Sequence, residues 1–264
     1  MSPPPRRPPA ALLVPAGLGV ALVVVPVVGL LQRAPWSTLI DRLSDDAVVE
    51  AIRVSLVVSI VAAAIATALG LPLAWLLART EGRVAGLIRA AVLVPMVLPP
   101  VVGGTALLFA LGRRGFVGQR LDDWFGVTLP FTTAGAVVAA TFVALPFFVT
   151  TVEAALRQAG VELEEAAAVS GASPLMTFVT VTVPASRDAI LAGVALAWAR
   201  ALGEFGATIT FAGNLAGETR TLPLEIFLAL ESDPESAVAV SVLLLTVSLG
   251  VLVALRGRWF NRDV

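Results

Sequence analysis

The sequence contains no cysteine and no histidine, and arginine accounts for all 18 of its basic residues. Without cysteine the chain can form no disulfide, no thiolate nucleophile and no iron–sulfur cluster. Without histidine it lacks the commonest metal ligand and the commonest general base. We therefore expect neither a bound metal nor a catalytic site in this chain.

Charge is also scarce. Only 14% of the residues are charged and 58% are hydrophobic, with a mean hydropathy of +0.92. A soluble globular domain usually carries about 25% charged residues. The net charge of −1 points to no particular partner, and we expect no nucleic acid among the partners.

Hydrophobic runs dominate what is present. Six of them approach the roughly 20 apolar residues that a bilayer-spanning helix needs. They lie near residues 10–31, 54–78, 90–111, 134–156, 189–212 and 237–255. None alternates with a period of two, so helices fit better than barrel strands. The sequence predicts an all-α integral membrane protein with six transmembrane helices, in one domain over residues 10–264.

The N-terminus carries Arg6 and Arg7 within a proline-rich stretch, residues 1–9, which we expect to be disordered. The apolar run that follows could be a signal peptide. It is longer than the usual 7–15 residues of such a core, and no A-x-A cleavage site closes it. An uncleaved first helix is the favoured interpretation.

The arginines indicate an orientation. With six spans both termini lie on one side, and that side would hold ten arginines against seven on the other. By the positive-inside rule the termini are cytoplasmic. Three arginines in the loop at 112–133 weaken this assignment.

Residues 157–188, here called the EAA loop, form a long connection on the same side as the termini. Three glutamates crowd the first turn of a predicted helix, where the positive end of the helix dipole favours them: Glu162, Glu164 and Glu165. Gly171 is placed to end this helix in the left-handed conformation. Ser173 then caps a second helix that begins at Pro174. The loop should therefore fold as helix, tight turn and helix.

The spacing within this loop resembles the EAA motif of permeases from ATP-binding-cassette (ABC) importers, E-A-A-x3-G-x9-I-x-L-P. The matching residues are Glu165, Ala166, Ala167, Gly171, Val181, Val183 and Pro184. The two valines depart mildly from isoleucine and leucine. The resemblance implies the type I importer permease fold and assigns ATPase coupling to Glu165, Ala166, Ala167, Gly171 and Pro184. Without the resemblance, the loop would be a capped helix with acidic residues for solubility.

A second stretch resembles the molybdate branch of this family. It comprises R-A-L-G-E-F-G over residues 200–206 and G-E-T-R-T-L-P-L over residues 217–224. Sulfate permeases share the run at 200–206, whereas the run at 217–224 is more similar to that of molybdate permeases. The resemblance spans roughly residues 45–260 and does not separate molybdate from tungstate.

The resemblance also implies a multi-pass location in the bacterial cytoplasmic membrane and a set of partners. They are a second copy of the chain, a cytoplasmic ABC ATPase dimer and an extracytoplasmic molybdate-binding protein. The ATP would be used by the ATPase, so this subunit would bind no cofactor and catalyse no reaction.

A dianion cannot cross hydrocarbon, so weak polar groups must line its route. In the third span, proline and glycine favour a hinge or gate: Pro99, Pro100, Gly103 and Gly104, with Thr105 beside them. The alternative is a kinked helix whose glycines allow close packing. In the fifth span the candidates are Thr208, Thr210 and Asn214, with Thr210 and Asn214 expected on one helix face. Their hydroxyls could instead bond their own backbone.

Arg200 and Glu204 lie four residues apart near the middle of the fifth span. We expect them to form an intramembrane ion pair with a structural role. A direct contact between Arg200 and the anion is the less favoured interpretation, because Glu204 repels anions.

Three alternative functions remain open. A sulfate or thiosulfate permease would share most of the motifs. A secondary transporter would show paired broken helices in two halves, and no such repeat is evident. An intramembrane enzyme would need facing catalytic groups that the spans lack.

Overall fold

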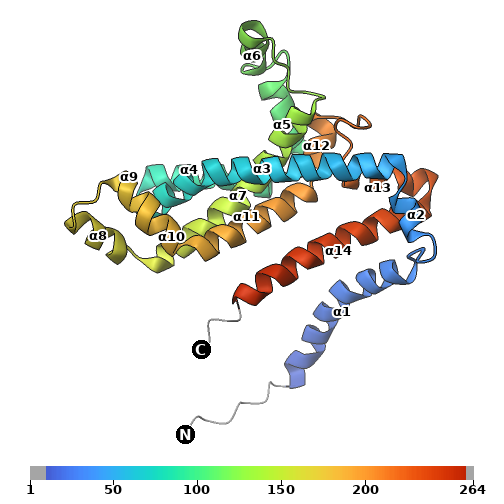
Figure 1. Cartoon of the computed structure of the whole chain (residues 1–264), viewed down its shortest axis with the longest axis horizontal. Coiled ribbons are helices and arrows are strands. Elements are labelled where there is room, and N and C mark those ends of the chain that lie inside the picture. Colours follow the sequence, from blue (N-terminus) through green and yellow to red (C-terminus); the bar gives the residue numbers. More distant parts are fainter. Residues whose placement is uncertain (1–9, 260–264) are drawn as a thin grey trace.

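The computed structural model describes residues 10–259. The predicted disorder of residues 1–9 lies outside this range. Every regular element among the described residues is helical. The helices form an elongated bundle with short helices at both ends (Figure 1).

Four helices are long and apolar enough to cross a bilayer singly. They are α1 (Ala10–Gln32), α3 (Asp46–Arg79), α7 (Thr133–Ala159) and α14 (Pro234–Trp259). With 34 residues, α3 measures about 51 Å and exceeds the roughly 30 Å hydrocarbon core. Its start is capped by Asp45, whose carboxylate accepts the N–H of Ala47 at 3.0 Å.

Two bent pairs of helices are further candidate spans. The first pair consists of α4 (Arg83–Val97) and α5 (Pro100–Leu111), with a bend of 117° between them. The second pair includes α11 (Arg187–Leu202), bent by 77° from the helical segment Pro174–Ala185 before it. If each bent pair counts as one span, the described residues hold up to six, in line with the sequence.

The predicted continuous helix over residues 189–212 is wrong in one respect. The chain leaves helical geometry after Leu202 and resumes it in α12 (Gly206–Phe211). Hydropathy averaged over the length of a span does not reveal this interruption, because the break is only three residues long, Gly203 to Phe205.

The core lies where α3, α7 and α11 pack side by side. Phe148 of α7 is fully buried there. A Cβ atom at Gly70 of α3 would lie 2.6 Å from its ring, and one at Gly193 of α11 would lie 3.1 Å from it. Small residues on two neighbours therefore make room for one large ring, as is common between membrane helices.

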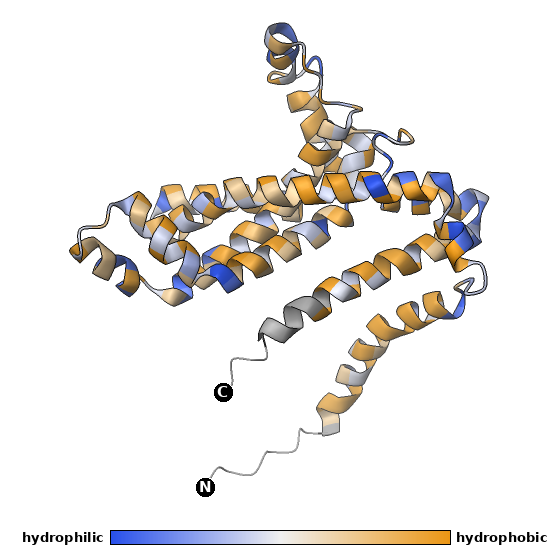
Figure 2. Cartoon of the chain, viewed as in Figure 1, coloured by the Kyte–Doolittle hydropathy of each residue, from blue (hydrophilic) through white to orange (hydrophobic). Residues whose placement is uncertain are grey.

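Short helices close the two ends of the bundle. One end carries α2 (Leu39–Leu43) and α13 (Leu222–Ser232); the other carries α8 (Glu162–Val169), α9 (Pro174–Thr177) and α10 (Val183–Ala185). Polar residues gather at these ends, and apolar ones cover the spans between them (Figure 2). At the first end Arg42 links α2 to the start of α14 through Asp233, at 2.8 Å, and Glu235.

Two elements lie apart from the core. None of the side chains in the α1 span is buried, and the helix contacts mainly α14. Helix α6 (Gly118–Phe125) extends beyond α5, away from the bundle (Figure 1). Exposed apolar side chains on α1 suit a lipid environment, where they need no burial against protein.

Candidate functional site

The turn in the EAA loop has the predicted geometry. Gly171 has a φ of 87°, and the N–H of Ala172 donates to the carbonyl of Ala167 at 3.0 Å. This is the left-handed end of helix α8. The hydroxyl of Ser173 accepts the N–H of Met176 at 3.3 Å, which caps α9. Helix, turn and helix are thus confirmed.

Glu164 fastens the EAA loop to the bundle. Its carboxylate accepts hydrogen bonds from Arg79 at 3.0 Å, Trp75 at 3.3 Å and Thr182 at 2.8 Å. Arg79 also donates to the carbonyl oxygens of Leu156 and Gly160. The end of α3 is therefore bonded to both the end of α7 and the start of α8.

Two opposing effects act on the pKa of Glu164. Burial raises it, but the hydrogen bonds from Arg79 and Thr182, together with the charge of Arg79, outweigh burial. The pKa consequently lies below the ordinary value for a glutamate, and the carboxylate stays charged at neutral pH. From the sequence we predicted only that Glu164 interacts favourably with the dipole of its own helix. Its hydrogen bonds to Arg79, Trp75 and Thr182 were not predicted.

A second carboxylate joins three helices beside the EAA loop. Glu153 of α7 pairs with Arg89 of α4 at 2.7 Å and with Arg157 at 3.0 Å. Both arginines also donate to the carbonyl of Leu77 near the end of α3. The carbonyl groups exposed at that helix end are satisfied in this way.

The motif residues lie on the open side of the loop. Glu165, Ala166, Gly171 and Pro184 are exposed, and Ala167 is half-buried. Six large apolar side chains of the loop are also exposed: Val161, Leu163, Val169, Leu175, Met176 and Val179. An exposed apolar group of this kind is typical of a protein–protein contact.

Pro184 follows a wide helical turn that the sequence did not predict. Residues Phe178–Thr182 form a π-helix in which Val183 donates its N–H to the carbonyl of Phe178. Pro184 has no N–H with which to continue an ordinary helix. π-turns are frequent at functional positions, and this one lies between α9 and α11.

The breaks in the third and fifth spans touch each other. A Cβ atom at Gly206 would lie 2.6 Å from Pro100, and one at Gly104 would lie 2.8 Å from the carbonyl oxygen of Ala207. Helices α5 and α12 therefore pack with their backbones in close approach. Helix α4 ends at Val97 and α5 begins at Pro100, as expected for the alternative of a kinked helix with closely packed glycines; the role of this segment as a gate stays a prediction.

The hydroxyl groups predicted to face a pore are mostly engaged. Thr105 donates to the carbonyl of Val101 at 2.9 Å and Thr210 donates to that of Gly206 at 2.8 Å. Thr208 is 1% exposed, and its hydroxyl has no partner among the described residues. Self-bonding of hydroxyls to the backbone is therefore the better description of Thr105 and Thr210.

Asn214 does not share a helix face with Thr210, so that expectation is wrong. Helix α12 ends at Phe211, and Gly213 turns the chain with a φ of 75°. Asn214 instead accepts a hydrogen bond from Arg220 at 3.0 Å. It belongs to the loop that leads into α13.

The predicted ion pair between Arg200 and Glu204 is present, at 2.7 Å. The single helix expected to carry both residues is absent, because α11 ends at Leu202. Glu204 lies in the break and is 2% exposed. Its other carboxylate oxygen accepts the N–H of Ala207 at 2.7 Å, at the start of α12.

The run at 217–224 is bonded to two spans. The N–H of Leu222 donates to the hydroxyl of Ser55 in α3 at 2.7 Å, and the hydroxyl of Thr133 in α7 donates to the carbonyl of Glu218 at 2.9 Å. Thr219 is fully buried and accepts the N–H of Leu215. These bonds hold the run firmly at the end of the bundle opposite the EAA loop.

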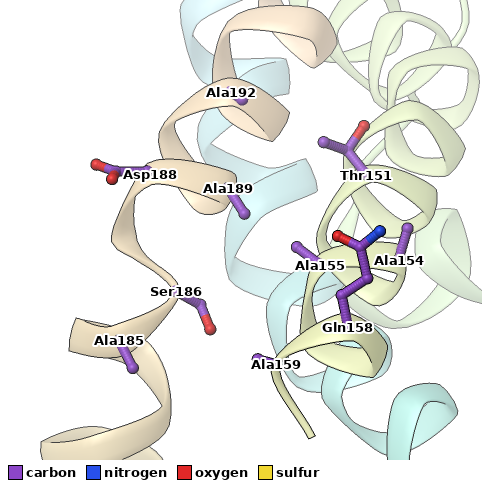
Figure 3. A pocket seen from close by; sticks show the side chains of 10 residues that line it. All are labelled: Thr151, Ala154, Ala155, Gln158, Ala159, Ala185, Ser186, Asp188, Ala189 and Ala192. Atoms are coloured by element: carbon purple, nitrogen blue, oxygen red, sulfur yellow. The ribbon is translucent and has the colours of Figure 1, made fainter. Parts of the chain in front are cut away.

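A hollow of about 660 Å³ opens between α7 and the start of α11, next to the EAA loop (Figure 3). Its lining is Thr151, Ala154, Ala155, Gln158, Ala159, Ala185, Ser186, Asp188, Ala189 and Ala192. The Asp188 carboxylate points away from α7 in this view. The rest of the lining is small, neutral and weakly polar, so neither motif spacing nor hydropathy predicts this hollow.

Comparisons with known proteins agree with this arrangement. A model of the family described as the inner membrane component of binding-protein-dependent transport systems matches residues 70–264. The molybdenum transport system permease protein ModB of Mycobacterium tuberculosis is 41% identical over 255 residues, covering 97% of this chain and 96% of that protein. ModB of Escherichia coli is 43% identical over 169 residues, covering 64% and 74%.

Two further matches bear on substrate and fold. The sulfate transport system permease protein CysT of Salmonella typhimurium is 41% identical over 160 residues, covering 60% of this chain and 57% of that protein. A crystal structure of a bacterial ABC transporter that imports alginate superposes with a TM-score of 0.76 at 16% identity. The superposition covers 96% of this chain and 95% of the matched one. The two chains therefore share the same fold.

The contact between α5 and α12 can be tested with two glycines in neighbouring helices. Gly104→Ala should lower the thermal stability of the purified chain, because its new methyl group meets the backbone of Ala207. Gly86→Ala in α4 has nothing within 4 Å, so it should stabilise slightly, by up to about 1 kcal/mol, through helix propensity. Equal melting temperatures for the two variants would contradict the close approach.

The bonds of Glu164 predict a pH-dependent loss of stability. Glu164→Gln should destabilise the chain at pH 7 by about 1 kcal/mol, the modest value for an ion pair at the edge of solvent. Because folding lowers this pKa, the stabilisation is present above the ordinary glutamate pKa and is lost as pH falls through the lowered one. The stability gap to wild type, measured by thermal unfolding, should therefore shrink in acid. The exposed Glu162→Gln serves as control, and a gap that stays constant with pH would refute the mechanism.

Proposed function

Since this chain belongs to the family of inner membrane components of binding-protein-dependent transport systems, we propose that it is the membrane-spanning permease subunit of an ATP-driven importer of molybdate. The assignment of molybdate as the substrate rests on the 41% identity to a molybdenum permease over 97% of the chain. The G-E-T-R-T-L-P-L run at 217–224 agrees with it. Tungstate, of nearly the same size and charge, would share the path.

Two copies of the chain would enclose one path, and a cytoplasmic ATPase dimer would drive it. The exposed apolar side chains on the EAA loop support a docking contact with the ATPase. The bonds of Glu164 and Glu153 support a stiff attachment, so that a push on the loop would reach α3 and α7. The subunit itself would then need no catalytic site and no cofactor.

The arginine distribution supports an orientation with the EAA loop and both termini in the cytoplasm. The opposite end of the bundle, with α2 and α13, would then face an extracytoplasmic molybdate-binding protein. Between the two ends, α5 and α12 would form the gate. The hollow beside α7 and α11 would lie where the path reaches the cytoplasm, with neutral hydroxyl and amide groups that let an anion leave.

A sulfate or thiosulfate importer is the second candidate, because a sulfate permease matches 60% of the chain at 41% identity. Molybdate is favoured because the match to the molybdenum permease extends over nearly the whole of both proteins.

Reconstitution tests the function. The chain is placed in liposomes with the cognate ATPase and binding protein, and uptake of labelled molybdate is measured. We expect uptake only when ATP, the ATPase and the binding protein are all present. Uptake without the ATPase would refute the importer and favour a secondary transporter.

A competition arm in the same vesicles tests the substrate. Unlabelled molybdate should suppress uptake far more strongly than an equal concentration of sulfate. Equal suppression would shift the assignment to the sulfate branch. Discrimination can reside in the binding protein, so its native form is used.

The turn at Gly171 predicts a loss of coupling. Gly171→Val should reduce uptake strongly, because a β-branched residue at this left-handed position costs roughly 1–2 kcal/mol. The site itself is open, with nothing within 4 Å of an added Cβ, so the backbone conformation alone opposes the change. Gly171→Asn, which tolerates this conformation, should retain most uptake. Normal uptake and ATPase binding by the valine variant would refute the role of the turn.

A further inference from the structure

We propose that Glu204 is a positioning residue that makes the gate helix α12 follow the movement of α11. The inference rests on the proposed function, because it concerns how force from the ATPase reaches the gate.

The two oxygen atoms of Glu204 bind two different helices. Oε2 pairs with Nη2 of Arg200 in the last turn of α11 at 2.7 Å. Oε1 accepts the N–H of Ala207 in the first turn of α12 at 2.7 Å. Between these helices the chain has no regular helix from Gly203 to Phe205. The backbone N–H groups of Gly203 and Glu204 still bond to α11, and the one carboxylate adds a side-chain bridge from α11 to α12 across the break.

The two bridged helices have different neighbours. Helix α11 begins directly after the EAA loop and packs along α7 and α3. Helix α12 packs mainly on α5, where Gly206 meets Pro100 and Gly104 meets Ala207. A displacement of the EAA loop reaches α11 directly along the chain. From α11 it reaches α12 across the break, in addition to the contact that α12 makes with α7.

Burial makes the bridge difficult to release. The Glu204 side chain is 1% exposed, and removing a buried carboxylate from its cation leaves an uncompensated charge. Arg200 and Glu204 should therefore stay paired while the helices move. A role in capping α12 alone would need only Oε1, so the pair with Arg200 is the part that links α11 to α12.

Glu204→Gln separates the two roles. The glutamine keeps an oxygen that can accept the N–H of Ala207, but it loses the charge that pairs with Arg200. In the reconstituted complex, ATP hydrolysis stimulated by the binding protein should continue. Molybdate imported per ATP hydrolysed should fall about tenfold, the size of a typical coupling between sites.

Asp122→Asn is the control. Asp122 of α6 also pairs with an arginine, Arg113, at 3.4 Å. Both residues lie on the same side of the break and outside α5, α12 and the EAA loop, so their pair spans no hinge. Import per ATP should stay at the wild-type value in this variant.

If the Glu204→Gln variant does not assemble with the ATPase, the double variant Arg200→Ala with Glu204→Gln is used to test the proposal. It buries no unpaired charge and keeps the cap, yet no ion pair links α11 to α12 across the break. The same loss of import per ATP, with normal assembly, supports the proposal.

Three results would overturn it: wild-type coupling in Glu204→Gln, wild-type coupling in the double variant, or a parallel fall in uptake and hydrolysis. A failure of the proposed function would give a different result. If the chain is not a molybdate importer, the wild-type chain itself will show no ATP-driven molybdate uptake.

Discussion

The high cost of leaving backbone polar groups unsatisfied in hydrocarbon governs this structure. Two spans are interrupted inside the bundle, and each interruption frees backbone N–H and carbonyl groups. The break before α5 falls at Pro99 and Pro100, which have no N–H to satisfy. The break before α12 is met by Glu204, which accepts a backbone N–H and is itself neutralised by Arg200. At the second break the Glu204 side chain is buried in protein, whereas Pro99 and Pro100 at the first break are exposed.

The hydrocarbon environment also explains why the helices pack closely. Lipid tails are as apolar as leucine, so contact between helices must come from shape and not from escape from water. Alanine and glycine on α3, α7 and α11 let these helices approach, and Phe148 fills the space between two of the glycines. The contact of α5 with α12 uses the same device at Gly104 and Gly206. A contact made by backbones can separate and re-form without repacking large side chains, which suits a gate.

Charged residues fasten the ends of the bundle, at the boundary with water. Glu164 and Glu153 connect the EAA loop and the ends of α3, α4 and α7, each through arginine partners that also cap free carbonyl groups. Because the loop is held at several points, a partner that moves it would move the helices with it. Force applied to the EAA loop at one end of the bundle would then pass along α11 to the break at Gly203.

The class of protein and the shape of the EAA turn could be predicted from the sequence. These depend on local properties: run length, the left-handed preference of Gly171 and the cap at Ser173. The ion pair of Arg200 and Glu204 was also predictable, because four residues separate them. Tertiary structure alone decided that a break lies between the pair, that Glu204 caps α12, that Asn214 leaves the helix and that Glu164 binds Arg79. The bond between Glu164 and Arg79 joins residues 85 positions apart, and the break lies where Gly206 meets Pro100 of another helix. The break is only three residues long, so hydropathy averaged over the length of a span does not register it.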